Sequence, residues 1–276
     1  MSDNDVKRAT GAVWGASPAG TTFGGDAHVG TREFFDRVLQ RRSTYEMPWL
    51  SAIVPFATMA GRRVVELGCG AGYDAYAFAT AGADYTGVDI TPQNPVRTRD
   101  HLALYGYACK TVQGDAEQLP FVSAHFDTAF SNGVLHHTPD LGAAVRETFR
   151  VLRSGGEFYI ILYHKTSIFH WVSLFLFDHI LQGNYRRRTM AERLSMIEYT
   201  TSDERPLVNV YRRGELRRVL RAAGFQVKRT WVRKLTPEDM PQQHGLGRVW
   251  QHVPQRLLDQ VGRAFGWYVI AHAVKP

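Results

Sequence analysis

The chain has 276 residues, of which 44% are hydrophobic and 12% aromatic, so it is long and apolar enough to bury a substantial core. A formal net charge of +7 favours anionic partners, but no RNA-binding module, zinc knuckle or recognition-helix pattern accompanies it, which argues against nucleic acid. Two cysteines cannot form a disulfide framework, and we find neither a secretory leader nor a run of about 18 apolar residues, so we expect a cytoplasmic protein.

The first 30 residues are rich in Gly and Ala and carry a turn signal at Pro18, which predicts a loop. Within this segment, Trp14 and Phe23 would be costly to leave exposed to water. We therefore expect the segment to fold over a ligand site as a lid.

Two helices are expected between this lid and the first strand. Thr31 is a candidate N-cap, and the apolar spacing over residues 31–46 is helical. A second, short helix is predicted over residues 49–59, with a kink near Pro55. Both helices would cover the ligand site.

The segment RVVELGCGAGYDAYAFATAGADYTGVD (residues 63–89) predicts a strand, a tight turn, a helix and a second strand, which is half of a nucleotide-binding βαβ unit. Its turn contains three glycines that allow close approach to a ligand, Gly68, Gly70 and Gly72. Glu66 and Asp89 end the two strands and would share the carboxyl edge of a parallel sheet, where such sheets bind ligands. Tyr73 stands where a dinucleotide fingerprint needs a small residue, so the turn favours a different nucleotide.

The sequence ELGCGAG (residues 66–72) resembles the first motif of the class I S-adenosylmethionine-dependent methyltransferases. By this resemblance, Glu66 would face the methionine amino group of S-adenosylmethionine, and Asp89 would hold the ribose hydroxyls. The cofactor-binding residues implied at this edge are Glu66, Gly68, Cys69, Gly70, Gly72, Asp89 and Ile90.

A second motif follows a predicted third strand at residues 110–113. GDAEQLPF (residues 114–121) resembles the methyltransferase segment in which an acid contacts the adenine amino group and the next backbone amide contacts the ring. The resemblance gives these two roles to Asp115 and Ala116.

A third motif lies at the end of the fourth predicted strand, residues 126–131. SNGVLHH (residues 131–137) resembles a segment of small-molecule methyltransferases of the ubiquinone and menaquinone biosynthesis type. This adds Asn132 to the expected cofactor-binding residues. No [DN]-P-P-Y sequence is found, which counts against methylation of DNA bases or of glutamine side chains.

The remaining elements continue the alternation of strand and helix. Helices are predicted from Pro95 to Gly106, from Asp140 to Leu152 and over residues 212–224. Strands are predicted at residues 157–163, 225–232 and 267–274, with an irregular connection at 233–265. The resemblance implies an α/β fold, a Rossmann-like doubly wound sheet of seven strands with the last strand antiparallel.

The alternation is interrupted by residues 164–212, which we expect to form a helical cap over the acceptor. A helix over residues 167–181 is apolar almost all round, so it is either buried or in contact with a lipid surface, and Arg186 to Arg188 beside it keep membrane docking open. The expected divisions are an N-terminal lid with helices (1–60), a cofactor-binding core (61–163), this cap (164–212) and the rest of the core sheet (213–276).

Methyl transfer from a sulfonium is an in-line displacement, so the site has to align two reactants and, where needed, remove a proton. The candidate catalytic residues at the strand ends are His136, His137, Tyr163 and His164, each with packing as its alternative role. We expect no metal, because no metal-binding helix motif is present and the side chains of adjacent histidines should diverge.

The sequence thus predicts an S-adenosylmethionine-dependent methyltransferase (EC 2.1.1 type) that acts on a small-molecule acceptor, of natural-product or secondary-metabolite type. One alternative is a lipid or quinone-like acceptor at a membrane surface, with peripheral membrane contact. An alternative of another class is a non-catalytic cofactor-binding subunit. The acceptor, the atom that is methylated and the oligomeric state stay open.

Overall fold

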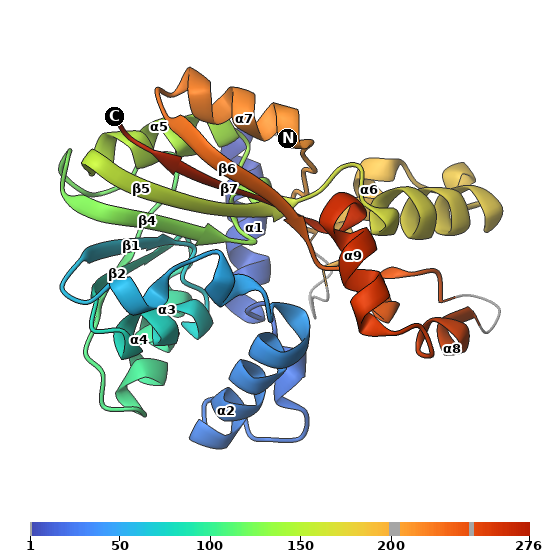
Figure 1. The fold of residues 1–276 in the computed structure, drawn as a ribbon, viewed down its shortest axis with the longest axis horizontal. Helices are drawn as coiled ribbons and strands as arrows, with labels where there is room; N and C mark the ends of the chain where they lie inside the picture. Colours follow the sequence, from blue (N-terminus) through green and yellow to red (C-terminus); the bar gives the residue numbers. More distant parts are fainter. Residues whose placement is uncertain (1, 199–204, 243–245) are drawn as a thin grey trace.

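The computed structural model describes residues 2–198, 205–242 and 246–276. At its centre lies a seven-stranded sheet with the strand order β3-β2-β1-β4-β5-β7-β6 (Figure 1). The strands are β1 (Arg63–Leu67), β2 (Asp84–Asp89), β3 (Lys110–Gln113), β4 (Phe126–Asn132), β5 (Leu152–Tyr163), β6 (Gln226–Arg233) and β7 (Tyr268–Val274). Only β7 runs antiparallel to its neighbours, β5 and β6, so the predicted doubly wound fold is confirmed.

Helices cover both faces of this sheet. On one face lie α3 (Tyr73–Thr80) and α4 (Gln93–Ala103), and on the other lie α5 (Leu141–Val151) and α7 (Arg213–Ala222) (Figure 1). Side chains alternate along β1, so that Val64 packs with Phe78 of α3, whereas Val65 packs with Leu216 of α7 and its neighbours. Burial on both faces explains why the central strands are apolar runs.

The N-terminal segment differs from its prediction as a loop, because α1 (Asp3–Ala16) is a helix. The side chain of Ser2 accepts a hydrogen bond from the Asp5 amide, and the Asp5 carboxylate accepts one from the Ser2 amide, which is a capping box. Gly11 and Gly15 lower the helix propensity of α1, but Val13 is fully buried against the rest of the protein. Tertiary packing therefore stabilises this segment as a helix.

The next elements follow the prediction more closely. α2 (Arg32–Arg41) begins after Thr31, whose side chain accepts a hydrogen bond from the Phe34 amide as a cap. The short helix expected at 49–59 is two 3-10 turns, Leu50–Ala52 and Phe56–Thr58, separated by Pro55.

Two predictions around prolines were wrong. α4 begins at Gln93 and contains Pro95 in its first turn, where a proline costs no helical hydrogen bond. The connection at 233–265, expected to be irregular, contains α8 (Leu246–Trp250) and α9 (Gln255–Phe265). Pro254 is the N-cap residue of α9, so this proline lies at the start of a helix.

The expected cap contains the predicted apolar helix, but as a π-helix, η6 (Phe169–Leu181). It is followed by the turn η7 (Asn184–Arg186) and by α6 (Met190–Ser195). Leu174 of η6 packs in a separate apolar cluster with Leu194 and Trp267, so one side of η6 is buried. Within the ranges described, no helix is both long and apolar enough to cross a membrane. The expected domain boundaries stay predictions.

Candidate functional site

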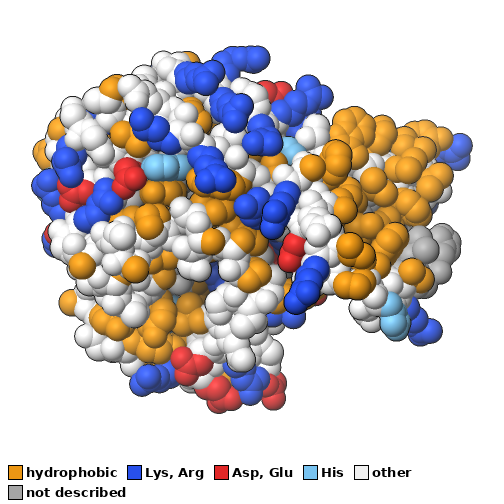
Figure 2. All heavy atoms as spheres, in the orientation of Figure 1, with side chains coloured by type: hydrophobic (Ala, Val, Ile, Leu, Met, Phe, Trp, Pro, Cys, Tyr) orange, Lys and Arg blue, Asp and Glu red, His pale blue; other side chains and the backbone are white. Residues whose placement is uncertain are grey.

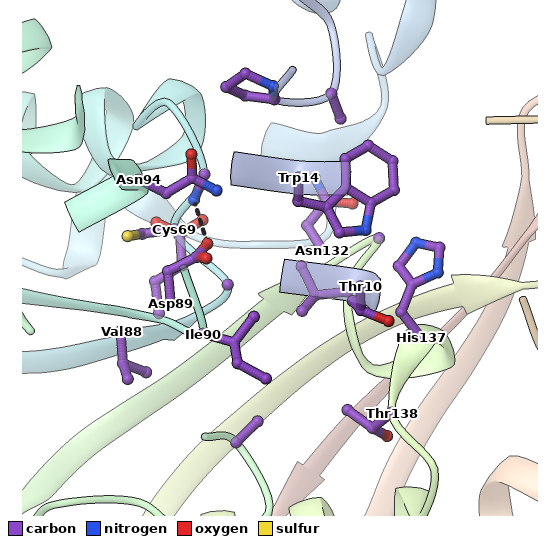
Figure 3. A pocket seen from close by; sticks show the side chains of 18 of the residues that line it. Thr10, Trp14, Cys69, Val88, Asp89, Ile90, Asn94, Asn132, His137 and Thr138 are labelled. Atoms are coloured by element: carbon purple, nitrogen blue, oxygen red, sulfur yellow. Dashed lines mark hydrogen bonds between the residues drawn. The ribbon is translucent and has the colours of Figure 1, made fainter. Parts of the chain in front are cut away.

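A cavity opens at the carboxyl edge of the sheet, where β1, β2 and β4 end beneath α1 (Figure 3). It is open to solvent, and the empty space in it and at its mouth together amounts to about 1110 Å³. Nine of the ten predicted cofactor-binding residues line it: Glu66, Gly68, Cys69, Gly70, Asp89, Ile90, Asp115, Ala116 and Asn132. The tenth, Gly72, caps α3 and packs against α4 instead.

The glycine-rich turn has the backbone that only glycine adopts easily. Gly68 has a φ of 78°, and a Cβ there would lie 2.3 Å from a methyl carbon of Val134. Gly70 also has a positive φ, of 56°, but a Cβ there would meet nothing within 4 Å. Gly68 is therefore required for packing, and Gly70 leaves the backbone open toward the cavity.

Asp89 is held in a defined orientation at the end of β2. One of its carboxylate oxygens accepts a hydrogen bond from the Gly70 amide at 3.0 Å, and the other accepts one from the Thr91 amide at 3.0 Å. Burial raises the pKa of Asp89, whereas the two amides favour its charged form. The side chains of Asn94 and Thr91 also favour the charged form.

Glu66 and Asp74 form a second acidic position beside the turn. Glu66 is 3% exposed and accepts a hydrogen bond from the Tyr85 hydroxyl. Burial, and next the charge of Asp74, raise the pKa of Glu66 well above its ordinary value, so a cationic ligand group nearby would be favoured. Asp74 accepts hydrogen bonds from Arg42 at 2.7 and 2.8 Å and from the Asn132 amide at 2.8 Å.

Helix α1 covers the cavity. Its Lys7 ammonium lies 2.7 Å from the Asp115 carboxylate and 2.6 Å from that of Glu117. Thr10 and Trp14 also line the cavity, and Figure 3 shows the indole facing His137. The expected lid therefore lies over the site as a helix, and it places a lysine on the acid expected to face adenine.

Three of the four predicted catalytic residues come together at the other end of the cavity. The ring centroids of His136 and His137 are 4.0 Å apart, and those of His136 and Tyr163 are 3.9 Å apart. His137 and Tyr163 line the cavity, whereas His136 is fully buried behind them. His164 lies elsewhere, with its ring bonded to the Gly266 carbonyl and the Thr166 hydroxyl.

The reason for expecting no metal does not hold. Adjacent histidines diverge on an extended strand, but Leu135–His137 forms a 3-10 turn, and the two rings converge. Glu198, which follows α6, completes a group whose possible ligand atoms all lie within 4.8 Å of one another. Burial lowers the pKa of His137 to about 4 and raises that of Glu198 to about 7, so this contact is not an ion pair at neutral pH.

Comparison with known proteins supports the same site. The family model for the methyltransferase domain matches residues 65–160, which contain the glycine turn, Asp89 and both histidines. An uncharacterized methyltransferase of Synechocystis is 30% identical over 149 residues, which are 46% of this chain and 68% of that protein. The chain belongs to the class I S-adenosylmethionine-dependent methyltransferases. The predicted family and its cofactor, S-adenosylmethionine, are thereby confirmed.

This methyltransferase is also similar to a second curated relative and to a solved structure. A probable phthiotriol/phenolphthiotriol dimycocerosates methyltransferase of Mycobacterium ulcerans is 35% identical over 173 residues, 61% of this chain and 64% of that protein. The crystal structure of the [4+2]-cyclase SpnF superposes with a TM-score of 0.62 at 18% identity, covering 98% of this chain and 96% of the other, which shows a shared fold. The chain spans about a third to two thirds of the length of the first curated relatives that it matches.

The cavity of this methyltransferase fits S-adenosylmethionine. Acids and open backbone gather at the strand ends, and four polar atoms of cavity-lining residues are buried without a hydrogen-bond partner among the described residues: Thr10 Oγ1, Trp14 Nε1, Tyr73 OH and His137 Nε2. Buried polar atoms without partners are rare in proteins, and a bound ligand would satisfy them.

Sequence reasoning missed several residues of the methyltransferase site. Asp74 lies in the first turn of α3, where an acid is commonplace, and Arg42 pairs with it from a distant segment. Lys7 and Glu198 carry no motif. Each of these four reaches the cavity only through the tertiary fold.

Proposed function

We propose that this protein transfers a methyl group to a small apolar or amphipathic acceptor. The observation that carries this proposal is a single cavity with acids for a cofactor at one end and His137, Tyr163 and Glu198 at the other. Bound S-adenosylmethionine supplies a methyl group on a positively charged sulfur. A further support for an apolar acceptor is the mycobacterial relative, whose name gives phthiotriol or phenolphthiotriol dimycocerosates as its acceptors.

At the cofactor end, the chain's own groups bind and orient. We infer that Asp89, oriented by two backbone amides, accepts hydrogen bonds from the ribose hydroxyls. Glu66 and Asp74 surround the position for the methionine ammonium, since burial makes an opposite charge favourable there. Asp115 and the Ala116 amide are left for the adenine, once Lys7 shares or releases the carboxylate.

At the acceptor end, the polar groups orient the second reactant and α1 excludes water. The Tyr163 hydroxyl donates to Glu198 at 2.8 Å, which fixes both groups at the cavity wall. The Trp14 ring lies 5.1 Å from that of His137 and closes the cavity from the α1 side. His136 is fully buried and does not line the cavity, so we assign it the orientation of its neighbours rather than proton transfer from the acceptor.

The experiment has two steps. Calorimetry with S-adenosylhomocysteine should show one binding site, and labelled S-adenosylmethionine should then transfer its methyl group to a component of an apolar metabolite extract. No binding of either cofactor form at millimolar concentration would refute the proposal. Binding without transfer to any acceptor would favour the alternative of a non-catalytic subunit.

A second candidate is methylation of a lipid or quinone-like acceptor at an anionic membrane surface. One side of the 169–185 segment exposes large apolar side chains, which Figure 2 shows as a hydrophobic area beside the sheet domain: Trp171, Leu176, Ile180, Leu181 and Tyr185. Trp171, Leu176 and Ile180 are spaced by five and four residues, which places them on one side of the π-helix, whereas Leu181 ends this helix and Tyr185 lies in the turn η7. Arg186 to Arg188 follow directly and are exposed, which complements anionic headgroups. A cytoplasmic location stays a prediction, and it is compatible with an acceptor at a membrane surface.

Vesicle sedimentation tests this candidate. Binding to phosphatidylglycerol vesicles should exceed binding to phosphatidylcholine vesicles, should weaken with salt, and should be lost in a Trp171→Ser, Leu181→Ser double variant. Val122→Ser is the matched control, because Val122 is 70% exposed on another part of the surface. Equal binding by the double variant and the wild type would exclude this surface as the docking site.

A further inference from the structure

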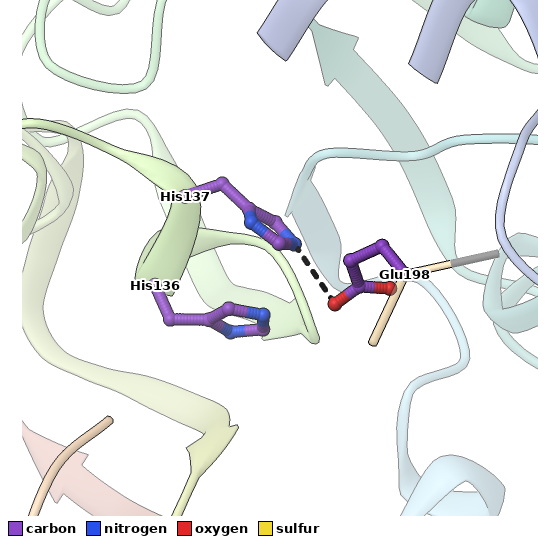
Figure 4. A group of neighbouring side chains, drawn as sticks. All are labelled: His136, His137 and Glu198. Atoms are coloured by element: carbon purple, nitrogen blue, oxygen red, sulfur yellow. Dashed lines mark ion pairs between the residues drawn. The ribbon is translucent and has the colours of Figure 1, made fainter. Parts of the chain in front are cut away.

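The corner formed by His136, His137 and Glu198 has the composition of a metal site (Figure 4). Two imidazoles come from the turn after β4, and the carboxylate comes from the segment after α6. Their possible ligand atoms lie within 4.8 Å of one another, and Figure 4 shows the carboxylate facing the ring of His137. Two histidines with one carboxylate are a common ligand set for catalytic transition metals.

The hydrogen bonds leave the histidine nitrogens without partners. His136 is fully buried, and neither of its ring nitrogens has a hydrogen-bond partner in the described part of the chain. The same holds for Nε2 of His137, which is 5% exposed. A buried nitrogen without a partner costs about 1–3 kcal/mol, and one ion could take one nitrogen from each of the two rings, so these atoms at one place indicate a missing ligand.

The tautomer of His137 sharpens this point. Its Nδ1 lies 2.6 Å from the Leu207 carbonyl oxygen, which can only accept, so Nδ1 carries the proton. Nε2 therefore presents a lone pair toward Glu198, whose Oε1 is 3.8 Å away. The gap between these two atoms is too long for a hydrogen bond, and Oε1 also accepts a hydrogen bond from the Tyr163 hydroxyl at 2.8 Å. A cation in the gap would be attracted to both atoms.

The separation between His137 and Glu198 suits a small transition-metal ion. With bonds of about 2.0–2.2 Å, neighbouring ligands of a tetrahedral zinc ion lie about 3.3–3.6 Å apart. The gap between His137 and Glu198 would have to close by only a few tenths of an ångström. A pair at the 4.8 Å limit of the group would have to close by more than about 1 Å, so binding requires the side chains to move inward. Mg²⁺ and Ca²⁺ prefer oxygen ligands, so two imidazoles select against them.

We propose that His136, His137 and Glu198 bind one divalent transition-metal ion, of the Zn²⁺ type, at the acceptor end of the cavity. The Leu207 carbonyl orients His137 from behind, as in other zinc sites where the second ring nitrogen is held by a carbonyl. Because His137 and Glu198 line the cavity, an open position on the ion would face the acceptor and bind its oxygen. This last role rests on the proposed function, whereas metal binding does not.

Metal binding to the full chain tests the proposal without an activity assay. Chelator-treated protein should bind one equivalent of Zn²⁺ by calorimetry, and Co²⁺ should give the visible absorption of a low-coordinate site. His137→Gln and Glu198→Gln should each weaken Zn²⁺ binding by about 100-fold or more, since loss of a ligand should cost at least as much as loss of an outer-shell partner. His179→Gln is the matched control, because His179 is also buried with an unpartnered nitrogen but lies outside the cluster.

Two results would overturn the proposal: no stoichiometric Zn²⁺ or Co²⁺ binding by folded wild-type protein, or equal binding by the wild type and both ligand variants. Circular dichroism and S-adenosylhomocysteine binding show that each variant is folded. Metal-free protein that binds S-adenosylhomocysteine and transfers methyl at the full rate would refute the acceptor-binding role and leave the proposed function standing. Metal binding by a protein that binds no cofactor would refute the proposed function and leave the metal site standing.

Discussion

Asp89→Asn should weaken S-adenosylhomocysteine binding by about 10- to 150-fold. In the wild type, both carboxylate oxygens of Asp89 are held by backbone amides at 3.0 Å, and the side chain is only 7% exposed. The asparagine keeps the size but places an NH2 group where an oxygen accepts, and it removes the charge. The expected loss is one charge-assisted hydrogen bond to the ligand, worth about 1.5–3 kcal/mol, which corresponds to that factor in the dissociation constant.

Calorimetry at constant pH and salt measures this change, and the urea unfolding midpoint separates it from a loss of stability. Asp84→Asn is the matched control, because Asp84 begins the same strand, its carboxylate accepts hydrogen bonds from the exposed Lys110, and it lies at the opposite edge from the cavity. An Asp89→Asn protein that binds S-adenosylhomocysteine as tightly as the wild type would show that Asp89 does not hold the ligand.

Two further predictions concern the turn and the sheet. Gly68→Ala should abolish cofactor binding and should lower the free energy of unfolding by more than Gly133→Ala does. Both positions have a positive φ, but only at Gly68 would the new Cβ clash, with Val134. Equal losses of stability in urea unfolding would contradict this. The pKa of Glu157 is lowered to about 2, first of all by its hydrogen bond with His272 at 3.0 Å. The contribution of Glu157 to the free energy of unfolding is therefore fully present above its ordinary pKa of 4.5 and is lost as the pH falls toward 2. Melting temperatures should fall less steeply over this range in Glu157→Gln than in the wild type, and parallel curves would refute the linkage.

Much of the sheet could be predicted because its signals are local. Apolar runs such as residues 64–65, bounded by glycine turns, specify buried strands whatever lies around them. α1 and α9 were not predicted. Gly11 and Gly15 weaken the helix signal of α1, which gains its stability by burying Val13. α9 does carry an amphipathic pattern of good helix formers, and it packs on β6 with Leu258 buried.

The candidate site divides along the same line. By itself, the sequence determined that a glycine turn and the acids at two strand ends share one edge of the sheet, because these are properties of neighbouring residues, and it predicted the cofactor there. Only the tertiary structure decided what faces that edge. Lys7 reaches Asp115, and Glu198 reaches His137, across long stretches of chain, and such contacts depend on packing that no local pattern encodes.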